Sequence, residues 1–128
     1  MRFRGVVRVG LDRSSSHKDP NYEVPPGAFW EGSLAKQGAS RTYANGQPIM
    51  RLGDSYHPHI GWKHIIDPTT GNVIQVPDEH SNVVAAEGSE TVMVENKPIH
   101  LRKYKVGCGN TWRDSVAVTG SKDVLVGE

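Results

Sequence analysis

Apolar residues lie along the chain in short runs, separated by polar residues and turn formers. No window of about 11 residues has the 3.6-residue apolar spacing of an amphipathic helix, so we expect almost no helix. Residues 6–9 read Val-Val-Arg-Val and are followed by Gly10, which favours a short strand. Residues 11–30 are mostly polar and proline-containing, which predicts a long loop. The pattern therefore predicts an all-β domain of short strands and hairpins.

A sequence motif of turn and strand residues occurs in three copies. Each copy has a Gly-Ser pair, a short alternating segment, and then a tight-turn signal. The copies begin at Gly32, Gly88 and Gly120. The first copy is longer up to its proline than the second, so we interpret residues 35–40 as a local insertion. Three copies in one short chain indicate a compact pseudo-threefold unit rather than a solenoid.

Two of the copies carry the signal of a two-residue hairpin turn. Asn45-Gly46 favours the positive φ values that such a turn requires, and Asn96 stands at the corresponding place in the second copy. Alternation places Val92 and Val94 on one face of the strand before Asn96. We therefore expect a small hairpin in each copy.

The length of 128 residues predicts a single domain, residues 1–128, with loop insertions at about 18–28 and 60–79. We expect the second insertion to be a hairpin around Pro68-Thr69-Thr70-Gly71. Apolar residues make up only 36% of the chain, and so small a core usually needs a disulfide, a metal or a partner. Cys108 is the single cysteine, which excludes an internal disulfide and leaves a metal ion or partner chains.

The charge balance excludes some classes of function. Fifteen Lys and Arg residues face 14 Asp and Glu residues, so no basic excess suggests a nucleic-acid partner. Residues 1–4 are basic, but no apolar run follows them as in a signal peptide. No apolar run approaches the ~20 residues of a membrane span. We expect a soluble chain made in the cytosol.

Four side chains are candidate metal ligands, because zinc prefers nitrogen and sulfur donors held on turns. Cys108 lies between two glycines that would let its sulfur approach an ion, although a free cysteine is often a small buried apolar residue. His80 and His17 are the next candidates, each with a solvated loop residue as the alternative. His57 and His59 lie one residue apart, so both would bind only if the segment curled around the ion.

The segment Asn45-Gly46-Gln47-Pro48-Ile49-Met50-Arg51-Leu52-Gly53-Asp54 resembles the repeat of the PAAR-repeat family, whose members are tip proteins of contractile injection machines. Residues 48–51 stand at the Pro-Ala-Ala-Arg position, and His80 precedes Gly88 by eight residues, as the second-repeat histidine of the family does. Residues 120–127 match the closing strand. The chain departs from the family motif where Lys103-Tyr104 stands in place of Gly-Asp.

The resemblance implies a small conical domain with one zinc ion, or an iron ion, near its apex. In this family a ligand lies six residues past the turn glycine, which selects His59 over His57. The implied ligand set is three histidines and one cysteine: His17, His59, His80 and Cys108. Four protein ligands leave no open position for water, so the resemblance implies a structural ion and no enzyme activity.

The implied partner is a trimeric β-helical central spike protein, with one chain per trimer and the chain otherwise a monomer. The implied role is to cap that spike and help pierce the target cell envelope. The implied location is the spike apex of a virion tail baseplate, assembled in the host cytoplasm, or alternatively secretion through a type VI apparatus. Because the last predicted strand ends near Glu128, we expect no fused toxin, which favours a phage baseplate.

Two other functions remain open at this point. A small zinc hydrolase would use Cys108, His80 and His59 with a bound water, and Asp54 or Glu79 as its base. A metal-free adaptor domain would use none of them. No standard catalytic motif is present. We expect His64 to lie at the surface, His100 within a strand, and Trp30, Trp62 and Trp112 to act as core or interface anchors.

Overall fold

Thirteen strands, most of them two to four residues long, form the part of the chain that the computed structural model describes: residues 2–19, 24–108 and 115–127. All strand pairs are antiparallel. These residues contain no helix, and hence none able to cross a membrane. The prediction of an all-β domain with almost no helix is confirmed.

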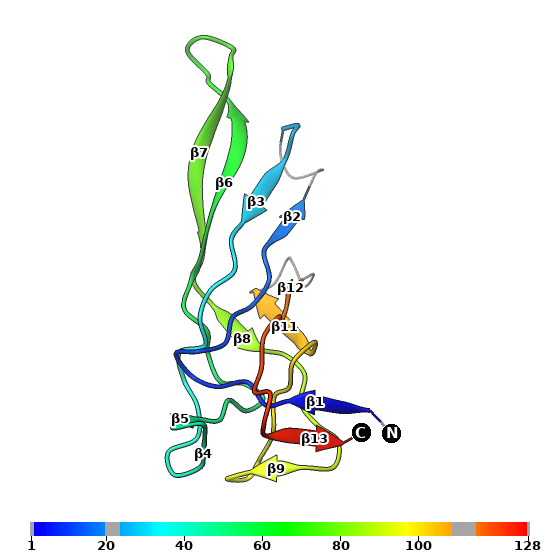
Figure 1. Cartoon of the computed structure of the whole chain (residues 1–128). Coiled ribbons are helices and arrows are strands. Elements are labelled where there is room, and N and C mark those ends of the chain that lie inside the picture. The colour runs from blue at the N-terminus through cyan, green and yellow to red at the C-terminus, as the bar shows by residue number, and fades with distance from the viewer. Residues whose placement is uncertain (1, 20–23, 109–114, 128) are drawn as a thin grey trace.

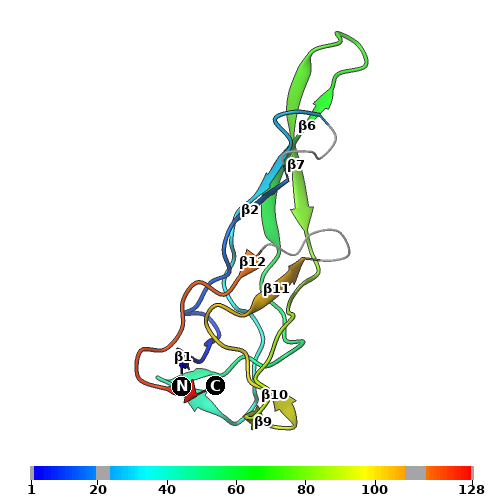
Figure 2. The same ribbon diagram turned by 90° about the vertical axis from the view of Figure 1, so that its right-hand side faces the viewer.

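The molecule tapers from a wide end to a narrow end, as two perpendicular views show (Figures 1 and 2). Both chain ends and three two-stranded pairs lie at the wide end. These pairs are β1 (Phe3–Gly5) with β13 (Leu125–Gly127), β4 (Tyr43–Ala44) with β5 (Gln47–Pro48), and β9 (Met93–Val94) with β10 (Lys97–Pro98).

Two larger sheets form the rest of the taper. The middle sheet has the order β12 (Ser115–Val116), β11 (Lys105–Cys108), β8 (Val83–Ala85). The narrow end is the sheet β2 (His17–Asp19), β3 (Ala28–Trp30), β6 (His59–Ile66), β7 (Val73–His80). The hairpin β6–β7 projects furthest from the wide end (Figure 1). It occupies the stretch where the sequence predicted an inserted hairpin.

A closed ring of backbone hydrogen bonds joins three related segments. The amide of Met50 donates to the carbonyl of Val7 (2.8 Å), the amide of His100 donates to Met50 (3.0 Å), and the amide of Val7 donates to His100 (3.1 Å). All three residues are fully buried. Each segment therefore contacts both of the others. The backbone amide and carbonyl of all three buried residues are paired, as buried backbone groups require.

The same pattern of hydrogen bonds corrects the alignment of the repeats. The amides of Ala39, Ser89 and Ser121 donate to the carbonyls of Ile49, Ile99 and Val6, at 2.8, 2.8 and 2.9 Å. Ala39, and not Ser33, is therefore the counterpart of Ser89, and the predicted insertion at residues 35–40 is wrong. The Gly-Ser pair is too short to fix a register.

A better sequence signal is an alanine followed three residues later by glycine. Ala35, Ala85 and Ala117 are all buried, and their carbonyls accept hydrogen bonds at 2.9, 2.9 and 2.7 Å from the amides at the three turn positions. Those positions are Gly10, Gly53 and Lys103, with φ values of 78°, 87° and 77°. The small alanine side chain lets the turn backbone approach closely at each corner.

Two of the three turns close with a buried ion pair. Arg8 binds Asp12 through Nε and Nη2, at 2.8 and 3.1 Å, and Arg51 binds Asp54 in the same way, at 3.0 and 3.3 Å. Each carboxylate also accepts the backbone amide of its own arginine. Both carboxylates are buried, so this bidentate pairing offsets their desolvation.

Two local predictions need correction and a third is confirmed. The strand expected at residues 6–9 lies instead at residues 3–5, and Val6 and Arg8 form only isolated bridges. Residues 11–30 were expected to form a loop but contain β2 and β3. These short strands exist because β3 pairs with the distant β6, a contact that local periodicity cannot reveal. The turns at Asn45-Gly46 and Glu95-Asn96 have the expected positive φ values.

The apolar core has two parts. One lies beneath the wide end and contains Val6, Ile49, Ile99 and Leu101, with Val92 and Val94 packed against it. The other lies in the middle of the taper and includes Cys108. Through Cys108, this second core contacts the group of histidines that includes His17 and His80.

Candidate metal centre

Three neighbouring hairpins bring three of the four predicted ligand residues together and place the fourth, His59, beside them. His17 begins β2, His59 begins β6, His80 ends β7, and Cys108 ends β11. His59 and His80 are paired directly across β6 and β7. The group therefore lies at the base of the β6–β7 hairpin, between the middle sheet and the narrow end. It is not at the outermost point, because that hairpin continues beyond it (Figure 1).

His17, His80 and Cys108 form a group that could hold a metal ion. Each offers one ligand atom, and these atoms all lie within 4.8 Å of one another. His17 and Cys108 are buried and His80 is partly buried. A separation of this size fits ligands around one ion, because zinc–ligand bonds of about 2.0–2.3 Å place tetrahedral donors under 4 Å apart after small adjustments.

His59 lies at the edge of this group. Its ring centroid is 5.2 Å from that of His17 and 6.4 Å from that of His80. It is fully buried, whereas His57 is exposed. Of the two neighbouring histidines, His59 is therefore the one that faces the interior.

Two buried ring nitrogens in the group have no hydrogen-bond partner among the described residues: Nε2 of His59 and Nδ1 of His80. The other side of the His59 ring is held by a backbone hydrogen bond with Glu31, and Nδ1 lies 3.5 Å from the Ser33 hydroxyl. Buried polar atoms in folded proteins are nearly always satisfied. A cation bound between these nitrogens would satisfy both, and the backbone contact would fix the His59 tautomer for binding.

Burial controls the protonation of the group. Desolvation, with smaller contributions from the other two histidines, lowers the pKa of His17 to about 4. Burial also lowers the pKa of His59 to about 4 and lowers that of His80. Burial raises the pKa of the Cys108 thiol to about 12. The imidazoles are therefore neutral at pH 7, the form that binds metals, and only the thiol must lose a proton on binding.

Trp30 is a part of the site that the sequence analysis did not place there. Its ring stacks on His80 at 4.1 Å and on His17 at 5.1 Å between centroids, and it is buried. Gly61 lies opposite Trp30 in the β3–β6 pair, and a Cβ at this position would collide with the Phe29 carbonyl and the indole ring. The glycine thus allows the indole to fix the orientation of two candidate ligands.

The glycine before Cys108 does not have the predicted role. A Cβ on Gly107 would meet only the Ala86 Cβ at 3.5 Å and more distant atoms, which is ordinary contact. Close approach of the backbone is therefore not required at this position. Gly109 and Trp112 lie outside the described residues.

The remaining histidines lie elsewhere. His64, expected at the surface, is partly buried, and its Nδ1 lies 2.7 Å from the Gly27 carbonyl. His100 is fully buried in the hydrogen-bond ring. Its Nδ1 is 2.8 Å from the carbonyl of Glu87 and its Nε2 is 2.9 Å from the hydroxyl of Tyr56. Burial lowers the pKa of His100 to about 4, so the neutral ring donates to Glu87 and accepts from Tyr56.

Comparison of the sequence with models of protein families and with curated proteins finds no match in either.

Proposed function

We propose that this chain is the metal-stabilised tip of the central spike of a contractile injection machine. In this proposal the domain is a PAAR-like, pseudo-threefold cone whose wide end caps a trimeric β-helical spike protein. The closed ring of hydrogen bonds through Val7, Met50 and His100 is the observation that carries it. One asymmetric chain that meets a threefold partner needs three similar faces, and three segments joined in a ring supply them.

The wide end supports this reading because the same strand position carries an exposed apolar side chain in all three repeats. Tyr43, Met93 and Leu125 are 58%, 60% and 49% exposed. Each precedes a buried or partly buried residue of its strand and pairs with the residue that leads into the ring: Pro48, Pro98 and Gly5 respectively. Exposed apolar side chains at three equivalent positions suit a partner that repeats the same surface three times.

The metal would act mechanically. The hydrogen-bond ring holds the wide half of the domain, whereas the half beyond it consists of the sheet β2-β3-β6-β7 and the sheet β12-β11-β8, which are separate sheets. A zinc or iron ion bound by His17, His59, His80 and Cys108 would join the two sheets at one point. Such structural sites contribute folding free energy directly, and four protein ligands would close the site to substrate.

The hydrolase alternative is less well supported. Asp54, one of its two candidate bases, is fully buried and bound by Arg51. Glu79, the other, is exposed on β7, where it pairs with Ile60 on the opposite side of the hairpin from His80. Neither carboxylate is positioned to activate a water on the ion. The metal-free adaptor is distinguished by metal content alone.

The docking part of the proposal is tested by mixing the purified chain with the trimeric β-helical spike protein of the same genome. Native mass spectrometry is expected to find one chain per trimer. Replacing Tyr43, Met93 and Leu125 together by aspartate should abolish the complex, whereas Ile66→Asp on the distant hairpin should not. Three chains per trimer, no complex, or equal loss with Ile66→Asp would refute it.

A further inference from the structure

The outer face of the sheet β2-β3-β6-β7 carries exposed side chains at the narrow end of the taper (Figures 1 and 2). Strand alternation turns His17, Trp30 and His80 to the inner face, where the candidate metal ligands gather, and leaves the adjacent residues of each strand outside. One row of directly paired residues crosses all four strands on the outer face: Lys18, Phe29, Trp62 and Pro77.

This outer aromatic row is a flat, largely apolar surface. Trp62 is 40% exposed, Pro77 is exposed and Phe29 is partly buried. The ammonium nitrogen of Lys18 lies 5.8 Å from the centroid of the Phe29 ring, so these two side chains share the face that the register gives them. Neighbouring strands lie about 4.8 Å apart, so the row from Phe29 to Pro77 is about 10 Å wide.

Hydrogen-bonding side chains flank the row on both sides. Towards the wide end, the exposed Glu79 pairs with Ile60. Towards the tip of the hairpin, the exposed Gln75 pairs with His64. Nδ1 of His64 lies 2.7 Å from the Gly27 carbonyl and donates to it, which in the neutral ring leaves Nε2 as an acceptor. A ligand on the row would therefore meet apolar surface beneath it and polar groups at its sides.

The size of this face argues against a folded protein or a second copy as its partner. From Ile60 to Ile66 and across four strands it is about 20 Å long and 19 Å wide, or at most about 400 Å² per molecule. Stable protein interfaces bury about 800 Å² per partner. Pro77 also interrupts β7, the edge strand, and so hinders the addition of a strand from another chain.

The end of the β6–β7 hairpin does not suit a lipid bilayer. The apolar pair Ile66 and Val73 is followed outwards by the polar turn of residues 67–72. The carboxylate of Asp67 accepts the amide of Thr69 in this turn, at 2.8 Å. This carboxylate would have to enter the hydrocarbon first, and open strand edges are not stable there.

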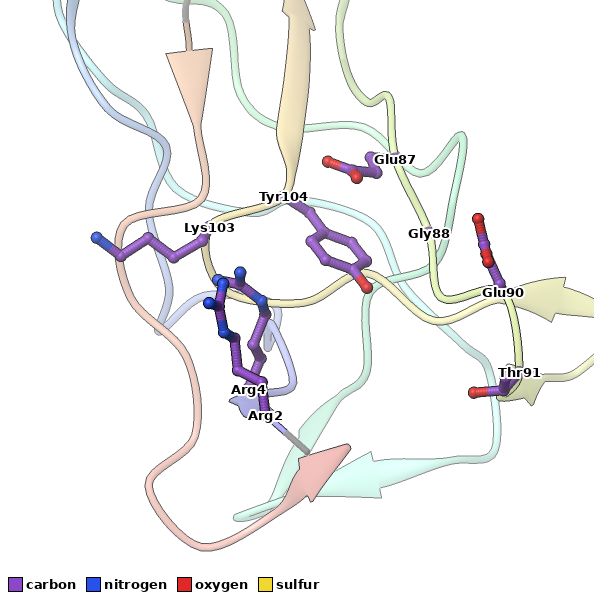
Figure 3. A pocket seen from close by; sticks show the side chains of 8 residues that line it. All are labelled: Arg2, Arg4, Glu87, Gly88, Glu90, Thr91, Lys103 and Tyr104. Carbon is purple, nitrogen blue, oxygen red and sulfur yellow. The ribbon is translucent and has the colours of Figure 1, made fainter. Parts of the chain in front are cut away.

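A cleft of about 630 Å³ beside Tyr104 is also less suited to a ligand. Arg4 lies over the Tyr104 ring, with Cζ at 5.9 Å from the centroid, and Glu87 accepts the amide of Lys105 at 3.0 Å. The Lys103 side chain points away from the Tyr104 ring (Figure 3). Arg4 and Glu87 are thus engaged within the domain, whereas the outer aromatic row is exposed.

We propose that the outer aromatic row binds a neutral, β-1,4-linked glycan chain. The sugar rings of such a chain carry C–H groups on their flat faces and hydroxyl groups around the rim. The C–H groups would stack on Phe29 and Trp62, and the hydroxyl groups would bond to Gln75 and Glu79. The spacing of the strands is close to the length of one sugar unit, so successive units would lie over successive strands.

Charge favours a neutral chain over an acidic one. Lys18 lies at one end of the row and Glu79 flanks the other, so a glycan with many carboxylates would gain at one end and be repelled at the other. This face is on the opposite side of the sheet from the metal centre and is remote from the wide end. The inference therefore does not rest on the proposed spike partner.

Cellotetraose and maltotetraose are matched probes, because both are chains of the same number of glucose units and differ only in their linkage. Titration of the ¹⁵N-labelled full chain with millimolar cellotetraose should shift the amides of β3, β6 and β7 near the row. Maltotetraose is coiled and cannot lay its units flat on the row, so it should bind about tenfold more weakly.

The deciding variant is Trp62→Ala, which should weaken the binding of cellotetraose about tenfold, whereas Trp62→Phe should restore most of it because a ring remains. Trp62 lies on the exposed face, so the melting temperature should change little. Ile66→Ala is the matched control. It removes an exposed apolar side chain from the same face, nearer the tip, and should bind as the wild type does.

Four results would overturn the proposal. One is the absence of any shift with cellotetraose. A second is equal binding of the two tetrasaccharides, because a flat row would then not select a flat chain. A third is equal loss of binding in Trp62→Ala and Ile66→Ala, which would indicate general apolar adhesion. The fourth is association with phosphatidylcholine vesicles, or self-association in sedimentation velocity, that is lost in Trp62→Ala, which would assign the row to a lipid or to a second copy.

Discussion

The stability of the domain should depend on the concentration of free zinc. Ligand binding to the folded state stabilises it by RT ln(1 + [L]/Kd), so each tenfold rise above Kd adds about 1.4 kcal/mol. For a chain of 128 residues, an unfolding entropy of about 2.1 cal/mol/K per residue gives about 0.27 kcal/mol per degree. The melting temperature should therefore rise about 5 °C for each tenfold increase in free zinc.

The assay is differential scanning fluorimetry in zinc buffers, with metal content measured in parallel. Cys108→Ser keeps the size of a buried side chain but removes the thiolate, so its response should begin only at much higher zinc concentrations. His57→Ala is the matched control, because His57 is exposed while its neighbour His59 is buried. It should follow the wild-type curve.

Two results would refute the reasoning. If the melting temperature of the wild type stayed constant from chelator to excess zinc, the buried histidines and Cys108 would not form a metal site. If Cys108→Ser and the wild type responded alike, an ion would bind elsewhere. Substituting iron(II) for zinc in the same assay distinguishes the two candidate ions.

Three further predictions concern stability and the shape of the site. Because burial lowers the pKa of His100 from 6.5 to about 4, the unfolded chain takes up this proton first, and stability should fall as pH drops from about 6.5 to 4, by about 3 kcal/mol in total. Urea unfolding with chelator should show a weaker pH dependence in His100→Met. Asp54→Asn should lower the free energy of unfolding by about 3 kcal/mol, because it leaves the Arg51 guanidinium without its carboxylate, as urea unfolding at pH 7 would measure. Gly61→Ala should displace Trp30 and weaken zinc binding about tenfold, as competition with a chelating dye would measure.

Matched controls separate these effects from general damage. Asp123→Asn removes an exposed carboxylate and should change stability little. Gly107→Ala adds a methyl group beside Cys108 in ordinary contact distance, and should leave zinc affinity close to that of the wild type. Loss of affinity in Gly107→Ala equal to that in Gly61→Ala would contradict the role given to Trp30. A parallel pH dependence in His100→Met and wild type would contradict the role given to His100.

The sequence was sufficient for the fold class and for the side chains that gather between the hairpins. Turn residues such as Asn45-Gly46 determine the conformation of their own segment, so the turn can be predicted from the sequence alone. His59 lies in the interior and His57 in solvent, which is compatible with the choice of His59 that the family resemblance implied. Which of these side chains bind an ion stays a prediction until metal content is measured.

What the sequence could not supply depends on pairing between distant segments. The short strands β2 and β3 form because β3 pairs with β6, and their own residues carry no period. Trp30 reaches the histidines for the same reason. Gly32-Ser33 was aligned wrongly with Gly88-Ser89 because two residues carry too little information. The backbone hydrogen bonds donated by Ala39 and Ser89 show that Gly38-Ala39 is the counterpart of Gly88-Ser89.

The pairing of β1 with β13 places the first and the last described strands next to each other at the wide end (Figure 1). None of the three segments in the ring has to come first in the sequence, so the chain termini could be moved to another loop. A circular permutant that joins β13 to β1 through a short linker and opens between Asp67 and Asn72 should retain the same topology. The fold would then not require the order in which the three segments occur in the sequence.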